Sequence, residues 1–189
     1  MGYKKNSSYA KRGMWLENII NDTNTYYLNK DIAIIYKKPT PIKVLNVSFR
    51  SKETTIIDKA VFSQASTLDY NGIYKGKYIE FDAKETKDKT SFKLSNIQNH
   101  QLTHIDNIIR HGGYAFLIIY MNNEFYLLNG VDLLLFIKNN ERKSIPYSYI
   151  KEHAFKIQEK YIPRIDYIKE LDKIIKEWFY GKFKVQNKF

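Results

Sequence analysis

Residues 67 to 84, TLDYNGIYKGKYIEFDAK, constrain the fold more than any other part of the chain. The Lys-Gly pair at 75–76 is typical of a two-residue turn between antiparallel strands. This turn fixes which residues face each other, because Tyr74 pairs with Lys77 and the further pairs follow by counting outward. We therefore predict a hairpin over 67–84 whose register is set by its turn.

The predicted register divides the hairpin into two chemically different faces. Asp69 lies opposite Asp82, Asn71 lies opposite Glu80, and Lys84 follows two residues after Asp82 on the same face. The other face carries apolar and aromatic side chains: Tyr70, Tyr74, Ile79, Phe81 and Ala83. One face is thus expected to pack in the core, while the other gathers three carboxylates and a lysine.

Two carboxylates that face each other across a ladder repel unless a positive group lies between them. A Mg2+ ion meets this need, since it prefers carboxylate oxygens, activates water and neutralises charge that develops on a phosphate. Lys84 would then orient or deprotonate the attacking water, or stabilise the phosphate. The pattern favours a site for phosphodiester hydrolysis. It leaves open two alternatives: a solvated hairpin face, and acids that neighbouring lysines neutralise without a metal.

The charge of the chain points to the kind of partner. Lys and Arg number 31 against 20 Asp and Glu, which gives a net charge of +11. This excess favours a polyanion, nucleic acid first and an anionic membrane surface second, although a basic surface also serves solubility alone. No cysteine is present, and neither a signal peptide nor a run of about 18 apolar residues is found. We expect a soluble cytoplasmic protein without a membrane partner.

Helical and strand patterns mix along the 189 residues, which are enough for one domain with a sizeable core. The fold class is therefore α/β. A helix is also expected to begin at a Ser95 cap. The spacing of apolar residues predicts helices over 14–28, 96–111, 131–139 and 165–180 and strands over 31–38, 114–121 and 124–130. The segment 142–164 is expected to be irregular, with a weak helical pattern in SYIKEHAFKI, residues 148–157.

A second hairpin pattern spans about 40–66, where the runs IKVLNVSF and TTIIDKAVF flank the polar turn RSKE. Cationic side chains occur along it at Lys43, Arg50, Lys52 and Lys59. Two interpretations stand side by side: two ordinary strands of the main sheet, or a projecting basic arm.

Several longer stretches, KRGMWLE, DIAIIYKKPTPIKV, FSQASTLDYNGIYKGKYIEFDAKETKDKTSF and YIPRIDYI, resemble the RecU family of Holliday junction resolvases from about residue 11 to 168. The resemblance implies a restriction-endonuclease-like core with the PD…(D/E)xK nuclease motif, in which a central mixed β-sheet is flanked by helices. It also implies one nuclease domain over 1–189, with a β-hairpin stalk inserted at about 40–66 and a C-terminal helix and tail at about 166–189.

The same resemblance implies a Mg2+-dependent homodimer that nicks two opposed strands of a four-way DNA junction, with Mn2+ as a substitute metal. Asp69 and Asp82 match the metal-binding carboxylates of the motif, and Lys84 matches its lysine. Thr67 and Gln101 match positions that complete the metal site in this family.

Gln101 has support from its own surroundings, because it shares a helical face with Ile97 and Ile105 and should point toward the sheet. The chain departs from the family pattern at two positions. Leu68 stands in the place of the motif's proline, and Asp82 stands where a glutamate is expected. The shorter aspartate places the metal closer to its strand or requires a bridging water.

Four further signals are ambiguous. His100 and His104 have the spacing of two zinc ligands, but without a third ligand they are interpreted as polar helix surface. Glu17 is either an extra acid of the site or a capping or surface residue, and Arg12 is either a phosphate contact or a solvated side chain. Glu80, one ladder position from the second aspartate, is a candidate to compensate for its shorter side chain.

In the family, the stalk enters the open centre of the junction, so Arg50, Lys52, Lys43 and Lys59 are expected to contact phosphates there and to recognise shape over sequence. A second role in modulating a recombinase filament is also implied, without assigned residues. Two alternatives remain open: a nuclease that acts on linear duplex, and a non-catalytic junction-binding or recombinase-modulating protein in which Asp82 marks a decayed site.

Overall fold

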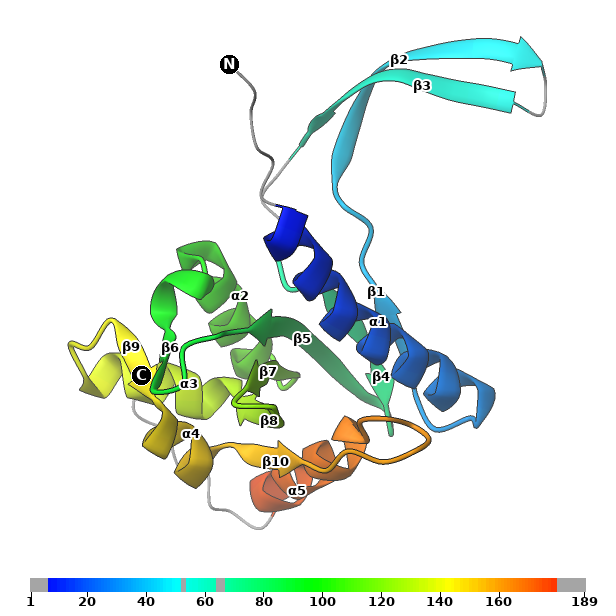
Figure 1. Ribbon diagram of the computed structural model, residues 1–189. Coiled ribbons are helices and arrows are strands. Elements are labelled where there is room, and N and C mark those ends of the chain that lie inside the picture. Colours follow the sequence, from blue (N-terminus) through cyan, green and yellow to red (C-terminus); the bar gives the residue numbers. More distant parts are fainter. Residues whose placement is uncertain (1–6, 52–53, 64–66, 180–189) are drawn as a thin grey trace.

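A mixed six-stranded sheet forms the centre of the protein (Figure 1). The computed structural model describes residues 7–51, 54–63 and 67–179. In this sheet β5 and β7 run parallel, whereas all other neighbouring strands run antiparallel. The strands follow the order β1 (Ile34–Lys37), β4 (Tyr70–Tyr74), β5 (Lys77–Glu85), β7 (Tyr114–Met121), β8 (Glu124–Asn129) and β10 (Phe155–Ile157).

Helices cover both faces of this sheet, and each face has its own hydrophobic core. One core is formed with α1 (Ser7–Asn29) and α5 (Tyr167–Phe179), and it takes up the aromatic face of β4 and β5. The other core is formed with α2 (Asn99–Arg110), α3 (Gly130–Asn139) and α4 (Tyr147–His153). In the part of the chain that the structure describes, no helix is both long and apolar enough to cross a membrane.

The β4–β5 hairpin has the predicted register. Tyr74 pairs with Lys77 and Asn71 pairs with Glu80. The two-residue Lys-Gly turn thus sets the register of the two strands, as predicted. Asp69 lies in a bend directly before β4, one position beyond the last ladder pair. The predicted faces are confirmed, because Tyr70, Tyr74, Ile79 and Phe81 enter the core beneath α1.

Gly72 allows β1 to join the edge of this hairpin. A Cβ atom at Gly72 would lie 2.1 Å from the carbonyl oxygen of Ile34 and 2.7 Å from the Cα of Ile35. A side chain at this position therefore excludes the present approach of β1.

The second hairpin projects from the body of the protein (Figure 1). Its strands, β2 (Ile42–Ser51) and β3 (Thr54–Phe62), pair with each other in a separate two-stranded sheet. The projecting arm, and not a pair of ordinary sheet strands, is thus the correct interpretation. We call β2 and β3 the stalk.

Two local predictions are wrong. Ser95 caps no helix, because it lies in a short 3-10 helix, η1 (Leu94–Asn96). The N-cap of α2 is Gln98. Its side chain accepts a hydrogen bond from the backbone N–H of Gln101, and the Gln101 side chain accepts one from the backbone N–H of Gln98. The segment predicted as irregular contains two strands that were not expected: β9 (Ser144–Pro146), which pairs with β6 (Ser91–Lys93), and β10. Its weak helical pattern over 148–157 is confirmed for the part that belongs to α4. These three-residue strands are too short to show an alternating pattern.

Candidate active site

The polar face of β5 is buried, although acids and lysines on a hairpin usually face solvent. The side chains alternate along the strand, so Ile79 and Phe81 enter the core beneath α1 while Glu80 and Asp82 point toward α2. Glu80 is 1% exposed and Asp82 is fully buried. The alternative of a solvated hairpin face is therefore wrong.

Asp82 is the centre of a small group of contacts. Its Oδ2 accepts hydrogen bonds from Gln101 Nε2 and from Lys84 Nζ, each at 2.8 Å, and its Oδ1 accepts the backbone N–H of Ala83. Gln101 Nε2 also donates to the carbonyl oxygen of Thr67 at 3.1 Å. Gln101 is buried and faces the sheet as predicted, and α2 thereby ties the segment before β4 to the middle of β5.

Asp69 lies against Asp82 even though the two residues are not a ladder pair. Burial, the charge of Asp82 and a hydrogen bond with Asp82 raise the pKa of Asp69 to about 6, against the opposing charge of Lys84. Glu17 on α1 adds to this rise by its negative charge. Two acids thus face each other with a tendency to share one proton, which is the situation that a bound cation relieves.

Glu80 has partners of its own. Lys38 and His104 both contact its Oε1, the latter at 2.9 Å, and the Tyr78 hydroxyl donates to Oε2 at 2.5 Å. Burial raises the pKa of Glu80, but the hydrogen bonds from Lys38 and Tyr78 and the nearby positive charges outweigh it and lower the pKa. Lys38 Nζ also donates to the Thr67 hydroxyl at 2.5 Å.

These contacts correct two sequence interpretations. His104 is not plain polar helix surface, because it meets a buried carboxylate, and Glu80 is engaged by its own cations instead of standing in for a longer acid at position 82. Sequence reasoning missed Lys38 altogether. It follows β1, an edge strand in which Ile35 is the buried residue, so the local sequence pattern did not indicate its partner.

The residues gathered here form an oxygen-rich donor set. Within the described ranges, no three His, Cys, Asp or Glu side chains gather closely enough to hold a metal ion. Asp69 and Asp82 instead supply two carboxylates, next to the hydroxyl and carbonyl of Thr67. Gln101 turns its Nε2 to this group and orients Asp82, because its Oε1 accepts the backbone N–H of Gln98. Hard oxygen ligands of this kind suit Mg2+, which retains several waters and needs few protein ligands.

Comparison with known families tests the resemblance seen in the sequence. The family model described as RecU, Recombination protein U, matches residues 11–173 of the 189. The match includes every strand of the mixed sheet and all the residues of the candidate site described above. The chain belongs to the RecU family.

Relatives in the RecU family cover nearly the whole chain. The Holliday junction resolvase RecU of Bacillus mycoides (strain KBAB4) is 46% identical over 175 residues, which are 90% of this chain and 88% of that protein. The protein of the same name from Geobacillus kaustophilus (strain HTA426) is 46% identical over 173 residues, 89% and 86% of the two chains. The solved structure of Archaeoglobus fulgidus Hjc, a Holliday junction resolvase, aligns with 78% of this chain and 93% of its own chain, at 11% sequence identity. The TM-score of this alignment is 0.44, which is too low to support an argument about fold or function.

The other predicted residues of this RecU-family chain lie apart from the acids. Lys43 and Lys59 are exposed on the stalk. Arg50 belongs to β2 and Arg12 to α1, but the side chains of both lie outside the described part, as does Lys52 entirely. The DNA-binding role of all five therefore stays a prediction.

Glu17 and Leu68 have defined places in this RecU-family chain. Glu17 pairs with Lys37 at 2.5 Å and acts on the pKa of Asp69, so it lies beside the acids and is no helix cap. Leu68, in the position of the motif's proline, is fully buried in the core beneath α2. A core contact thus replaces the rigidity of proline before Asp69.

Proposed function

We propose that this protein is a structure-selective DNA endonuclease that resolves four-way (Holliday) junctions in the cytoplasm, by paired Mg2+-dependent nicks during recombination and repair. The observation that carries the proposal is the pair of facing acids, Asp69 and Asp82, with Lys84 bonded to the second. The RecU-family relatives named above support the junction as substrate. We further propose one nuclease domain, into which the stalk is inserted.

In this proposal Asp69 and Asp82 hold the metal, with Thr67 and Gln101 completing its surroundings. Mg2+ supplies the activation of water and the neutralisation of charge on the phosphate. Gln101 keeps the buried carboxylate of Asp82 in position through its 2.8 Å hydrogen bond. Lys84, whose ammonium group lies 2.8 Å from Asp82, is placed to donate to a water or to a phosphate oxygen at the same point.

We also propose that the protein acts as a homodimer. Ile34, Ile73 and Tyr78 form a row across β1, β4 and β5 because each pairs with the next, and their exposed fractions are 51%, 56% and 42%. Further exposed apolar side chains line the stalk: Ile42, Val44, Leu45, Ile56, Ile57, Val61 and Phe62. Apolar surfaces of this extent mark protein contacts, and a second copy of the chain supplies the second nick.

The stalk is proposed to enter the open centre of the junction, where Lys43, Arg50, Lys52 and Lys59 contact phosphates. Its projection from the body supports this role (Figure 1). Phosphate contacts position the DNA without reading bases, which suits recognition of junction shape. A recombinase filament is a further proposed partner, without assigned residues.

The test is cleavage of a synthetic four-way junction and of matched linear duplex, with and without Mg2+. Asp69→Ala and Lys84→Ala should each lower the rate of nicking at least about a thousandfold. Junction binding should stay close to that of wild type. Lys169→Ala, an exposed change on α5, is the control.

Three other results would contradict parts of the proposal. Normal cleavage by either variant would make the site assignment wrong. Equal cleavage of linear duplex would remove junction selectivity. Tight junction binding without cleavage in Mg2+ or Mn2+ would identify a non-catalytic junction-binding protein.

A further inference from the structure

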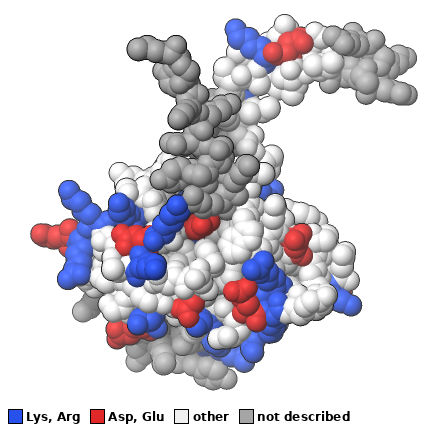
Figure 2. All heavy atoms as spheres, viewed as in Figure 1, with Lys and Arg blue, Asp and Glu red and all other residues white. Residues whose placement is uncertain are grey.

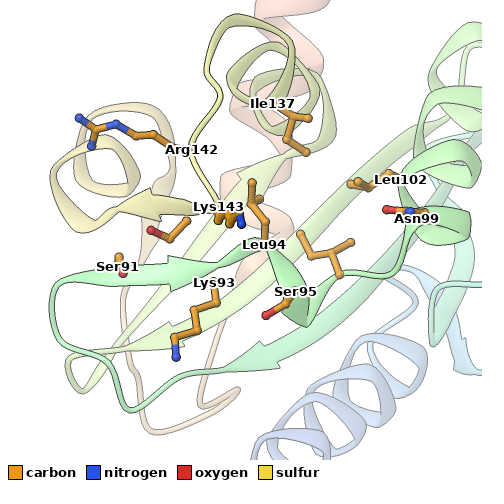
Figure 3. Close-up of a pocket in the computed structure, with 11 residues that line it drawn as sticks. Ser91, Lys93, Leu94, Ser95, Asn99, Leu102, Ile137, Arg142 and Lys143 are labelled. Atoms are coloured by element: carbon orange, nitrogen blue, oxygen red, sulfur yellow. The ribbon is translucent and has the colours of Figure 1, made fainter.

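A cavity of about 590 Å³ opens between η1, α2, α3 and the β6–β9 ribbon, away from the acids (Figure 3). Its size falls within the roughly 300–1,000 Å³ of ligand-binding clefts. The floor is apolar and belongs to the core beneath α2 and α3. The lining residues are Ser91, Lys93, Leu94, Ser95, Ile97, Asn99, Leu102, Ile137, Arg142, Lys143 and Ser144.

The polar part of this lining suits an anion. Lys93, Arg142 and Lys143 are exposed, and no carboxylate is among the lining residues. None of the three forms an ion pair with another residue in the described part of the chain, in contrast to Lys38 and Lys84 at the active site. Three serine hydroxyls and one asparagine amide add hydrogen-bond donors.

One acid acts on this cavity from outside its lining. Hydrogen bonds from Thr90 and the charge of Lys93 lower the pKa of the Asp88 carboxyl. The oxygens of this carboxylate are already used in hydrogen bonds within its own loop. It accepts the backbone N–H groups of Thr90 and Ser91 and the Thr90 hydroxyl, and so closes the loop before β6. The surface on this side is rich in Lys and Arg (Figure 2).

The cavity and the candidate active site lie on opposite sides of the first turn of α2. Asn99 and Leu102 line the cavity, whereas Gln101 between them bonds to Asp82. The width of a helix with its side chains, about 10 Å, therefore separates the cavity from the acids. Phosphates of one DNA strand advance by about 3.4 Å per base pair along the helix axis while winding around it, so one duplex can present nearby but different phosphates to the cavity and to the acids.

We propose that this cavity binds the phosphate backbone of one duplex arm of the junction, close to the bond that is cut. The inference rests on the proposed endonuclease function and adds a second contact that lies outside both the acids and the stalk. Cations and hydroxyls that approach phosphates fix the position of a duplex without reading its sequence. The cavity thus holds the arm in register while the acids act on the neighbouring phosphate.

The experiment compares two double variants of the full chain. Arg142→Ala/Lys143→Ala removes two charges from the cavity, and Lys169→Ala/Lys176→Ala removes two exposed charges from α5, which packs on the other face of the sheet (Figure 1). Junction affinity is measured at several salt concentrations without divalent cations. The cavity variant should flatten the plot of log K against log salt by about 2 units of slope and weaken binding about tenfold. The α5 variant should match wild type.

Neutral methylphosphonate groups, placed singly at each phosphate near the cut, locate the contact. In wild type, a group at one phosphate on the duplex arm beside the cut should weaken binding, and in the cavity variant the same group should have no further effect. Equal salt slopes for both double variants, or an undiminished effect of the methylphosphonate in the cavity variant, would overturn the inference. Addition of Mg2+ to the wild-type samples tests cleavage separately, so loss of the proposed function is distinguished from loss of this site.

Discussion

The proposed role of Asp69 as a metal ligand requires a negative charge that destabilises the metal-free folded protein. Its pKa rises from 3.8 to about 6, because it is buried against Asp82. The folded protein therefore holds this proton more tightly than the unfolded chain does, and ionisation of Asp69 costs stability as the pH rises from about 4 to about 7. Below about pH 4 the residue is protonated in both states and the cost disappears.

Asp69→Asn should consequently stabilise the metal-free protein at pH 7.5 by about 1–3 kcal/mol and have little effect at pH 3.5. Mg2+ should raise the melting temperature of wild type and leave that of the variant unchanged. Urea unfolding at several pH values, with and without Mg2+, measures both effects. A variant that is less stable than wild type at pH 7.5 without metal would show that Asp69 does not carry this cost.

Variants of Asp82 test whether an aspartate can act at the position where the motif has a glutamate. Asp82→Asn keeps the shape but removes the charge, and should lower junction cleavage at least about a thousandfold. Asp82→Glu should retain cleavage within about tenfold while losing about 1–3 kcal/mol of stability, since the added methylene has to fit a fully buried position. Equal rates for Asp82→Asn and wild type would exclude a role of this carboxylate in the reaction.

At the level of elements, the stalk is structurally separate from the sheet that carries the acids. Its strands pair with each other, and Ile42 faces Phe62 where they begin and end. Replacement of residues 43–61 by a short Gly-Ser linker should therefore leave the main sheet folded, as judged by circular dichroism. The preference for junction over linear duplex should fall to near unity. Preserved selectivity without the stalk would assign junction recognition elsewhere.

The parts of the fold that the sequence predicted are those with local rules. A two-residue turn fixes the β4–β5 register, and helical periodicity alone directs Gln101 toward the sheet. The partners of Glu80 were not predicted, because Lys38 comes from 42 positions earlier in the chain and His104 comes from α2. Such pairings depend on how elements pack, which neither propensity nor spacing reports. Burial of the acidic face escaped prediction for the same reason.

For the whole molecule, the row formed by Ile34, Ile73 and Tyr78 predicts the state of assembly. The protein should be a dimer at micromolar concentration, and Ile34→Asp/Ile73→Asp should make it monomeric, because charges on a buried contact are costly. Tyr161→Asp, at a residue that is 96% exposed outside this row, is the control. Sedimentation equilibrium measures the mass. A dimer of unchanged strength in the double variant would place the contact on another surface.

Lys38 gives the stalk a mechanical connection to the acids. It follows β1 and lies four residues before β2, its backbone N–H donates to the carbonyl of Asp69 at 2.7 Å, and its ammonium group holds both Thr67 and Glu80. A hydrogen bond thus joins Lys38, four residues before β2, to Thr67, five residues after β3. We therefore expect DNA that contacts the base of the stalk to lie next to Asp69 and the other residues that are proposed to cut it.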